Sequence, residues 1–403
     1  MPKILKDKKL IDTFLNRGVE AIYPSKKAFE KKLLSGERLK IYQGFDPTGK
    51  YLHIGHAMGI RALRILQQLG HEVIFLVGDF TSKVGDPDKD TTREMLTDKK
   101  IAENMKGWKE QASQLIDFYG KNPVKFLHNY DWLHKLKFED ILELMSKITL
   151  QRMIERDMFE RRLKDGDPIR LHELVYPLMQ GYDGVAMKVD LEIGGADQTF
   201  NMLIGRDLSK AYLGKEKFVR THKMMDAPDA RTMSKTKGNG INLSDSPQDM
   251  FGKAMSYPDE LILTGFELLT EIPTDEIAQI KKAMHKGENP MIFKKQMAYE
   301  IVKLIKGEKA AKEARNYFEQ VFSEGQNPDE APKIKVSQAE LLIDVLVNNN
   351  LAQSKSDAKR KMQQNGVKIE DKVKNDLGSK IEKDMDGKIL RVGKREFRRL
   401  VVG

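Results

Sequence analysis

Cysteine is absent from this chain of 403 residues, and long apolar runs are absent as well. Without cysteine there is no disulfide bond and no thiolate metal site. The longest apolar run, residues 73–77, is only as long as a strand, so no segment is expected to span a membrane. Residues 1–8 lack the apolar core of a secretory signal. We therefore expect an unprocessed, cytoplasmic protein with no membrane partner.

Positive charge is in excess and is unevenly distributed. The whole chain has a net charge of +10, and residues 333–403 contain 17 Lys/Arg against 10 Asp/Glu. Most of the excess therefore lies in the last part of the chain. A basic terminal region on a nearly neutral body indicates a polyanionic partner bound at one end. A lysine-rich surface that merely keeps the protein soluble is the alternative.

Hydrophobic periodicity divides the chain into three expected domains. Residues 1–243 alternate apolar strands with helices, which predicts an α/β fold with a Rossmann-like parallel sheet and a helical insertion at about residues 120–172. The segment before the first strand, residues 1–38, is expected to be helical. Residues 244–325 predict an α-helical domain. After an expected Pro- and Gly-containing linker at 325–332, residues 333–403 predict a small α+β domain.

The most informative stretch is residues 44–56, which joins an alternating strand to an amphipathic helix through a turn that contains His53 and His56. Both histidines are expected in the first helical turn, beside free N–H groups and the positive end of the helix dipole. Gly55 lets a flat ligand approach the backbone. A polyphosphate fits such a surface. Ordinary histidines at a helix start, or a metal-binding pair, remain the alternatives that the spacing allows.

A second pattern places three polar side chains on one helical face. Tyr176, Gln180 and Asp183 would present a phenol, an amide and a carboxylate together. Burying them without partners is costly, so a polar ligand accounts for them economically. An internal hydrogen-bond network is the alternative.

Three further segments carry polar groups at informative positions. Residues 189–198 predict a strand, a Gly-Gly turn and a helix begun by Asp197 or Thr199, with side chains placed for ribose hydroxyls. Residues 229–240 form a polar, basic loop that could be a simple connection. Near the end of the chain, Ser354 is expected to cap a basic helix over residues 354–364.

These motifs resemble those of the class I aminoacyl-tRNA synthetases, and in detail those of the tyrosyl branch. The similar elements are the Gly-Phe-Asp-Pro-Thr lead-in to His-Ile-Gly-His, the Tyr-x-x-x-Gln-x-x-Asp helix and the Gly-Gly-x-Asp-Gln turn. Residues 229–240 resemble the Lys-Met-Ser-Lys-Ser loop, except that Thr232 replaces its first lysine; Arg231 or Lys237 could supply that charge. Residues 333–403 resemble an S4-like RNA-binding domain.

The resemblance implies a reaction and its partners. The chain would activate L-tyrosine with ATP, release pyrophosphate and transfer the tyrosyl group to the terminal adenosine of tRNA(Tyr). Mg²⁺ would accompany ATP as part of the substrate, without a protein metal site. The insertion would build a homodimer.

The resemblance also assigns residues. Catalysis is assigned to Thr48, His53, His56 and Lys235. Tyrosine binding is assigned to Tyr42, Thr81, Asp86, Asn129, Tyr176, Gln180, Asp183 and Gln198. ATP binding is assigned to Asp46, Gly55, His53, His56, Gly195, Asp197, Met233, Ser234 and Lys235. RNA binding is assigned to Lys355, Lys359, Arg360 and Lys361.

Three rival functions remain at this point. A tryptophanyl-tRNA synthetase shares the fold and signatures, but its indole pocket would not need Tyr42 and Asp183 to converge on a hydroxyl group. A small-metabolite nucleotidyltransferase could use the same histidine turn, although the basic terminal domain argues against it. A non-catalytic RNA-binding relative is the third, because Thr232 departs from the signature.

Overall fold

The computed structural model describes residues 2–86, 95–225, 240–323, 331–370, 372–393 and 396–403. Contacts within the chain divide it into two compact units, Met1–Ala311 and Lys312–Gly403. Within the described ranges, no helix combines the length and the apolar character needed to cross a membrane. The residue bounds of the three domains expected from the sequence stay predictions.

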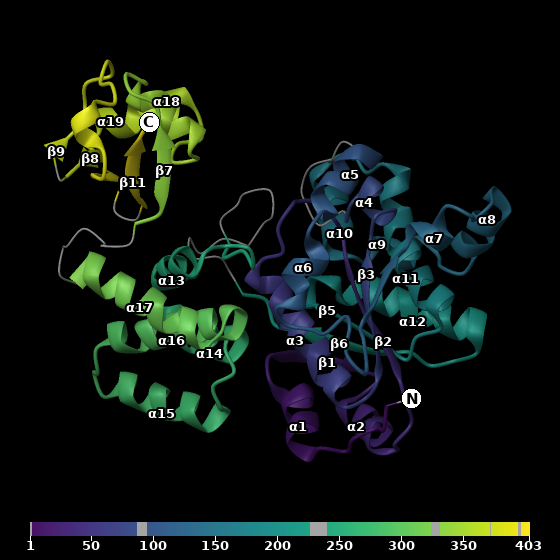
Figure 1. The fold of residues 1–403 in the computed structure, drawn as a ribbon. Helices are drawn as coiled ribbons and strands as arrows, with labels where there is room; N and C mark the ends of the chain where they lie inside the picture. The colour runs from purple at the N-terminus through teal and green to yellow at the C-terminus, as the bar shows by residue number, and fades with distance from the viewer. Residues whose placement is uncertain (1, 87–94, 226–239, 324–330, 371, 394–395) are drawn as a thin grey trace. The chain divides into compact units, whose positions relative to one another are not determined.

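The first unit is built on a sheet with helices packed around it (Figure 1). Among the described residues, this sheet has six strands in the order β1-β6-β5-β2-β3-β4. Neighbouring strands are parallel except that β1 runs antiparallel to β6. The strands are β1 (Val19–Tyr23), β2 (Lys40–Phe45), β3 (Glu72–Val77), β4 (Lys125–His128), β5 (Leu191–Gly195) and β6 (Phe218–His222). This arrangement confirms the predicted parallel α/β fold.

The strand order changes direction between β2 and β5. From β2 the chain continues outward through β3 and β4, whereas β5 and β6 lie on the other side of β2. In open parallel sheets, ligands bind beyond the carboxyl ends of the strands at such a switch point. The end of β2 leads into residues 46–56, and the end of β5 leads into residues 196–198.

Helices pack against this sheet. Helix α3 (Ile54–Gln68) packs against β2, β3 and β5, while α11 (Tyr176–Met187) and α12 (Thr199–Leu213) pack closely on each other. The other helices before α11 are α1 (Lys8–Asn16), α2 (Lys26–Leu34), α4 (Thr81–Val84), α5 (Asp98–Met105), α6 (Trp108–Ser113), α7 (Tyr130–Leu133), α8 (Phe138–Ser146), α9 (Leu150–Ile154), α10 (Asp157–Asp165) and the 3₁₀ helix η1 (Leu171–Val175).

One expectation for the start of the chain was wrong. Residues 19–23 were expected to be helical, but they form the edge strand β1, which pairs with β6. Two β-branched residues, Val19 and Ile22, occur here together with Tyr23, and such residues favour strands over helices. The local preference and the pairing with β6 at the sheet edge thus both favour a strand.

The helical region that follows the sheet also belongs to the first unit, and arginine side chains connect it to the part of the unit that contains the sheet. Its helices are α13 (Pro247–Met255), η3 (Asp259–Leu261), α14 (Ile262–Leu269), α15 (Thr274–His285) and α16 (Pro290–Lys306). Arg17 Nε donates to Glu267 O at 2.9 Å, and Arg61 Nη1 donates to Leu268 O at 2.9 Å. Carbonyls at a helix end lack partners within the helix, so these partly buried cations stabilise the end of α14.

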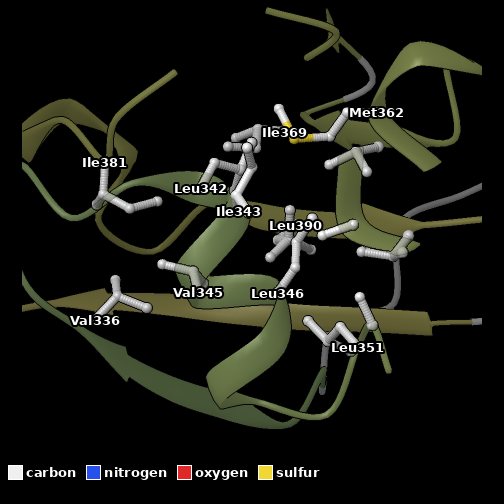
Figure 2. Close-up of a cluster of buried hydrophobic side chains, with 14 of the residues drawn as sticks. Val336, Leu342, Ile343, Val345, Leu346, Leu351, Met362, Ile369, Ile381 and Leu390 are labelled. Carbon is white, nitrogen blue, oxygen red and sulfur yellow. The ribbon is translucent and has the colours of Figure 1, made fainter. Parts of the chain in front are cut away.

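The second unit is a small α+β fold with its own core. Among the described residues its sheet has the order β7-β11-β10-β8-β9. Its elements are β7 (Lys333–Val336), α18 (Leu342–Asn348), α19 (Lys355–Gln363), β8 (Val367–Ile369), β9 (Lys372–Val373), η4 (Lys383–Met385), β10 (Ile389–Val392) and β11 (Glu396–Val402), preceded by α17 (Glu308–Ser323). Figure 2 shows Leu342, Val345 and Leu346 of α18 gathered with Leu390 in a cluster of buried side chains.

Candidate active site

The two signature histidines lie at the start of α3, as predicted. His53 is the N-cap residue, and its backbone N–H donates to Nδ1 of His56 at 3.0 Å. The two rings lie against each other, with centroids 3.7 Å apart. Because Nδ1 of His56 accepts a hydrogen bond, the proton of the neutral ring is on Nε2. His56 can therefore offer an Nε2–H donor to an anion near the helix start.

The segment after residue 239 is tied to these histidines. Asn242 forms an antiparallel bridge with His53, Ile54 N donates to Ile241 O at 2.8 Å, and Leu243 N donates to Leu52 O at 2.8 Å. The assigned residues Met233, Ser234 and Lys235 lie outside the described residues, as do Arg231, Thr232 and Lys237. The chain that follows them is anchored beside the start of α3.

A buried carboxylate lies on α11, where the sequence placed it. Asp183 is 3% exposed and accepts hydrogen bonds from Asn129 Nδ2 at 3.1 Å and from Trp132 Nε1 at 2.7 Å. Burial raises the pKa of Asp183 well above its ordinary value, and the two donors oppose that rise. Asn129 also donates to Thr81 Oγ1 at 3.0 Å.

Tyr42 lies close to this carboxylate. Its side chain is 1% exposed, and burial raises the pKa of its phenol well above the ordinary value, with Glu192 and Asp183 adding to the rise. The Tyr42 hydroxyl lies 3.5 Å from Gln180 O on α11, the helix that carries Asp183. Trp132 received no role from the sequence, because nothing in its local pattern relates it to a residue 51 positions away.

A second group of carboxylates surrounds Tyr176. The Tyr176 hydroxyl donates to Asp46 Oδ2 at 2.9 Å, and Thr81 Oγ1 donates to Asp46 Oδ1 at 2.8 Å. Burial raises the pKa of Tyr176 well above its ordinary value, and the carboxylates of Asp46 and Asp86 raise it further. Burial also raises the pKa of Asp197. A region rich in carboxylates suits a cationic group such as an ammonium.

Asp86 is held by two donors in this group. Gln198 Nε2 donates to its Oδ2 at 2.6 Å, and Arg156 Nη2 donates to its Oδ1 at 2.7 Å. Arg156 is 7% exposed and immediately precedes α10 in the predicted insertion. Sequence reasoning missed Arg156, because its partner Asp86 is 70 positions away along the chain.

The remaining assigned residues of the first unit lie at the same edge of the sheet. Thr48 N donates to Asp46 O at 2.8 Å in the turn after β2, and Gly55 is in the first turn of α3. Gly195 ends β5, and a Cβ placed on it would lie 2.8 Å from Met224 Sδ. The backbone there has no room for a side chain. No group of three or more metal-binding side chains occurs among the described residues.

The four residues assigned to RNA lie on α19, in the second unit. Ser354 caps this helix as predicted, accepting from Asp357 N at 3.2 Å. Lys355 pairs with Asp344 at 2.7 Å and Lys361 pairs with Asp357 at 3.0 Å, while the Lys355 side chain remains 69% exposed. Arg360 also pairs with Asp357, and its side chain is 68% exposed. These cations lie on one short, solvent-facing helix.

Comparison with known families gives two matches along the chain. Residues 34–323 match the model of class I tRNA synthetases for tryptophan and tyrosine, and residues 323–400 match the C-terminal domain of tyrosine–tRNA ligases. The first match covers strands β2–β6 of the sheet and the histidine-bearing start of α3. The fold and the site together define a class I aminoacyl-tRNA synthetase.

Curated relatives resolve the branch. The chain is 42% identical over 369 residues to the tyrosine–tRNA ligase of Thermotoga maritima, covering 91% of each chain. It is 39% identical over 393 residues to that of Moorella thermoacetica, covering 96% of this chain and 94% of the relative. The chain belongs to the tyrosine–tRNA ligase family.

Solved structures share the fold. A C-terminally truncated mitochondrial tyrosyl-tRNA synthetase from Aspergillus nidulans aligns with a TM-score of 0.65 at 23% identity, over 78% of this chain and 94% of the other. The tyrosyl-tRNA synthetase from Archaeoglobus fulgidus, solved with L-tyrosine, aligns with a TM-score of 0.59 at 20% identity, over 76% and 99%.

Proposed function

We propose that this chain activates L-tyrosine with ATP and then transfers the tyrosyl group to tRNA(Tyr). In the first step the tyrosine carboxylate oxygen attacks the α-phosphorus of ATP. The new C–O–P linkage forms as the bond to the bridging oxygen breaks, and pyrophosphate leaves. In the second step a ribose hydroxyl of the terminal adenosine attacks the acyl carbon, and AMP leaves with the electron pair of the broken bond.

Alignment and charge stabilisation account for the first step, because a carboxylate attacks as its own anion and needs no base. His56 offers its Nε2–H toward the phosphates from the start of α3, with Thr48 in the turn before it. Lys235, which lies outside the described residues, is proposed to act on pyrophosphate. Mg²⁺ enters bound to ATP, as part of the substrate.

Recognition of the substrate phenol is proposed to rest on Tyr42 and Asp183. The hydrogen bonds from Asn129 and Trp132 hold the Asp183 carboxylate in place, so that it can accept from a phenolic O–H. Phenylalanine would leave these buried groups without a partner, which is costly. At the other end of the amino acid, Asp86, Tyr176 and Gln180 would receive the ammonium.

The insertion supports a homodimer. Large apolar side chains there are exposed in the single chain: Phe138 at 74%, Leu142 at 52%, Met145 at 45%, Leu150 at 59%, Leu163 at 55% and Leu171 at 82%. Exposed large apolar side chains concentrated in one segment favour a protein interface, and most soluble homo-oligomers are twofold symmetric. We place the dimer face here and the protein in the cytoplasm.

The basic second unit is proposed to bind the tRNA. Only the second step needs the polyanion, so replacing Lys359 and Arg360 by alanine should weaken charging of tRNA and leave adenylate formation unchanged. The loss should be largest at low salt and should shrink as salt is raised, since each phosphate contact that is removed lowers the salt dependence of tRNA binding. An equal loss in both steps would contradict this division of the two activities.

The observation that carries the proposal is the Asp183 carboxylate, held by Asn129 and Trp132 beside the Tyr42 phenol. The test is charging of total tRNA by the full-length chain with labelled tyrosine or labelled tryptophan. We expect tyrosine alone to be attached. Attachment of tryptophan instead, or of neither amino acid, would overturn the proposal.

A further inference from the structure

A completely buried ion pair lies behind the candidate amino-acid site. Lys217 Nζ pairs with Glu192 Oε2, and the two side chains are 0% and 2% exposed. Glu192 is on β5, and Lys217 directly precedes β6. Taking two charges out of water is unfavourable, and such a pair is a weak source of stability compared with apolar packing. Its presence beside a binding site therefore calls for another explanation.

Two glycines on the neighbouring helices make room for the lysine, and a third lets the two helices approach each other. A Cβ on Gly205 would overlap Lys217 Nζ, and a Cβ on Gly184 would lie 3.3 Å from it. A Cβ on Gly181 would lie 3.0 Å from Gly205 Cα, so α11 and α12 are in close contact over the lysine. The ammonium is confined to this space and cannot turn toward solvent.

Glu192 also begins a continuous chain of hydrogen bonds that reaches the candidate ammonium site. Gln180 Nε2 donates to Glu192 Oε1 at 3.0 Å, and Asn201 Nδ2 donates to Gln180 Oε1 at 3.0 Å. Asn201 Nδ2 donates as well to Gln198 Oε1 at 3.2 Å. Gln198 Nε2 completes the chain by donating to Asp86 Oδ2 at 2.6 Å.

The chemistry of the two ends fixes the direction of every amide between them. An ionised carboxylate only accepts hydrogen bonds, so Gln180 must turn its nitrogen to Glu192 and its oxygen to Asn201. The same reasoning at Asp86 directs the nitrogen of Gln198 to Asp86 and its oxygen to Asn201. Each carboxylate has a buried cation of its own, Lys217 at one end and Arg156 at the other.

We propose that Glu192 and Lys217 are positioning residues for the amino-acid ammonium. Glu192 is fully buried and Gln180 is half-buried, so Gln180 is the nearest member of the chain that can reach a ligand. By fixing the Gln180 nitrogen, the ion pair directs the Gln180 oxygen to the ammonium side, where it accepts one hydrogen bond from Asn201 and has a second lone pair for the ammonium. This inference rests on the proposed function, because it assumes that Gln180 and Asp86 receive the tyrosine ammonium.

Glu192→Gln tests the direction of the amide chain. The new amide has one oxygen in place of two, and the Lys217 ammonium would take it. Its NH₂ group would then face Gln180, which must rotate and present a donor to the substrate ammonium. We expect the KM for tyrosine in ATP–pyrophosphate exchange to rise at least about tenfold, the loss expected for one hydrogen bond to a charged group. The KM for ATP should be unchanged.

The double variant Glu192→Gln with Lys217→Met distinguishes positioning from stability. Without the lysine, the oxygen of the new amide can accept from Gln180 again. The KM for tyrosine of the double variant should therefore return most of the way to that of the unaltered chain. The matched control is Lys215→Met, which removes a partly exposed lysine paired with Asp190 at 2.7 Å in the same β5–β6 region. The control should keep both KM values.

The outcomes distinguish failure of this inference from failure of the proposed function. The inference would be overturned if Glu192→Gln had a normal KM for tyrosine. It would also be overturned if this variant raised the KM values for tyrosine and ATP together and the double variant did not lower them again. Tyrosine-dependent exchange by the unaltered chain is measured alongside. Its absence would overturn the proposed function itself.

Discussion

The Tyr176 hydroxyl donates to the Asp46 carboxylate at 2.9 Å, which joins helix α11 to the turn after β2 across a separation of 130 residues. Tyr176→Phe removes this one bond and keeps the ring. Because hydrogen bonds to charged groups contribute about 1.5–3 kcal/mol, we expect roughly a tenfold or greater increase in the tyrosine KM. Tyr182→Phe on the same helix is the control, and similar kinetics in the two variants would refute the assignment.

Asp183 offers a test of selectivity for the phenol. Asp183→Asn keeps the shape of the side chain but replaces one acceptor oxygen by an NH₂ group. This NH₂ group would face the N–H donor of Asn129 or of Trp132, so that one of the two hydrogen bonds is lost. We expect tyrosine-dependent ATP–pyrophosphate exchange to fall by about a hundredfold, while the weak exchange with phenylalanine falls less. Asp207→Asn, on the exposed side of α12, is the control. An undiminished preference for tyrosine over phenylalanine in Asp183→Asn would rule out the pocket.

The anchor beside His53 offers a test of the ATP side. Asp245 Oδ2 accepts from Asn242 N at 2.7 Å and from Lys253 Nζ at 2.7 Å, and so fixes the segment that pairs with His53. Asp245→Ala should raise the KM for ATP several-fold and leave the tyrosine KM unchanged. Asp249→Ala, four residues on, serves as the comparison. The anchor would have no catalytic importance if both variants exchanged like the parent chain.

Stability should fall as the pH falls below neutrality. Burial lowers the pKa of His71 from 6.5 to about 4, and its neutral Nδ1 accepts from Leu39 N at 3.2 Å. The unfolded chain takes up a proton near pH 6.5, whereas the folded chain resists it, so stability is lost as the pH falls from 6.5 towards 4. Between pH 7 and pH 5 the loss from this group is about 2 kcal/mol.

His71→Gln removes that titration and should lose correspondingly less stability on acidification. His222, whose pKa burial lowers to about 3, acts in the same direction and remains in the variant. Urea unfolding followed by tryptophan fluorescence is suitable, since both tryptophans of the chain, Trp108 and Trp132, lie in the first unit. Identical pH dependence in the two proteins would contradict the assignment to His71.

The dimer face can be tested with a single charge. Leu142→Glu places a carboxylate in the exposed apolar surface of the insertion, where it would be buried without a partner in a dimer. Light scattering should report a dimer for the parent chain and a monomer for the variant at micromolar concentration. Leu5→Glu, at another exposed leucine, should remain dimeric. A monomeric parent chain would exclude the proposed face.

The sequence predicted those features that depend on local pattern. The strand before His53, the helix that places Tyr176 and Asp183 on one face, and the cap at Ser354 each follow from spacing within a few residues. The edge strand β1 was missed because its pairing with β6 involves residues about 200 positions away.

The partners of the site residues were beyond local pattern for the same reason. Arg156 and Asp86 are 70 positions apart, and nothing near either residue specifies the other. Glu192 did carry a signal, because it is the only charged side chain within β5, a strand that is buried throughout. A buried carboxylate requires a partner, but only the folded chain identifies Lys217 and Gln180 as the partners.

The central claim is that this chain activates tyrosine with ATP at the carboxyl ends of β2 and β5. The most direct measurement is ATP–pyrophosphate exchange by the full-length chain with tyrosine, tryptophan, phenylalanine or no amino acid. We predict rapid exchange with tyrosine, and only background exchange with tryptophan or without an amino acid. Exchange that is equally fast with tryptophan, or that needs no amino acid, would contradict the claim.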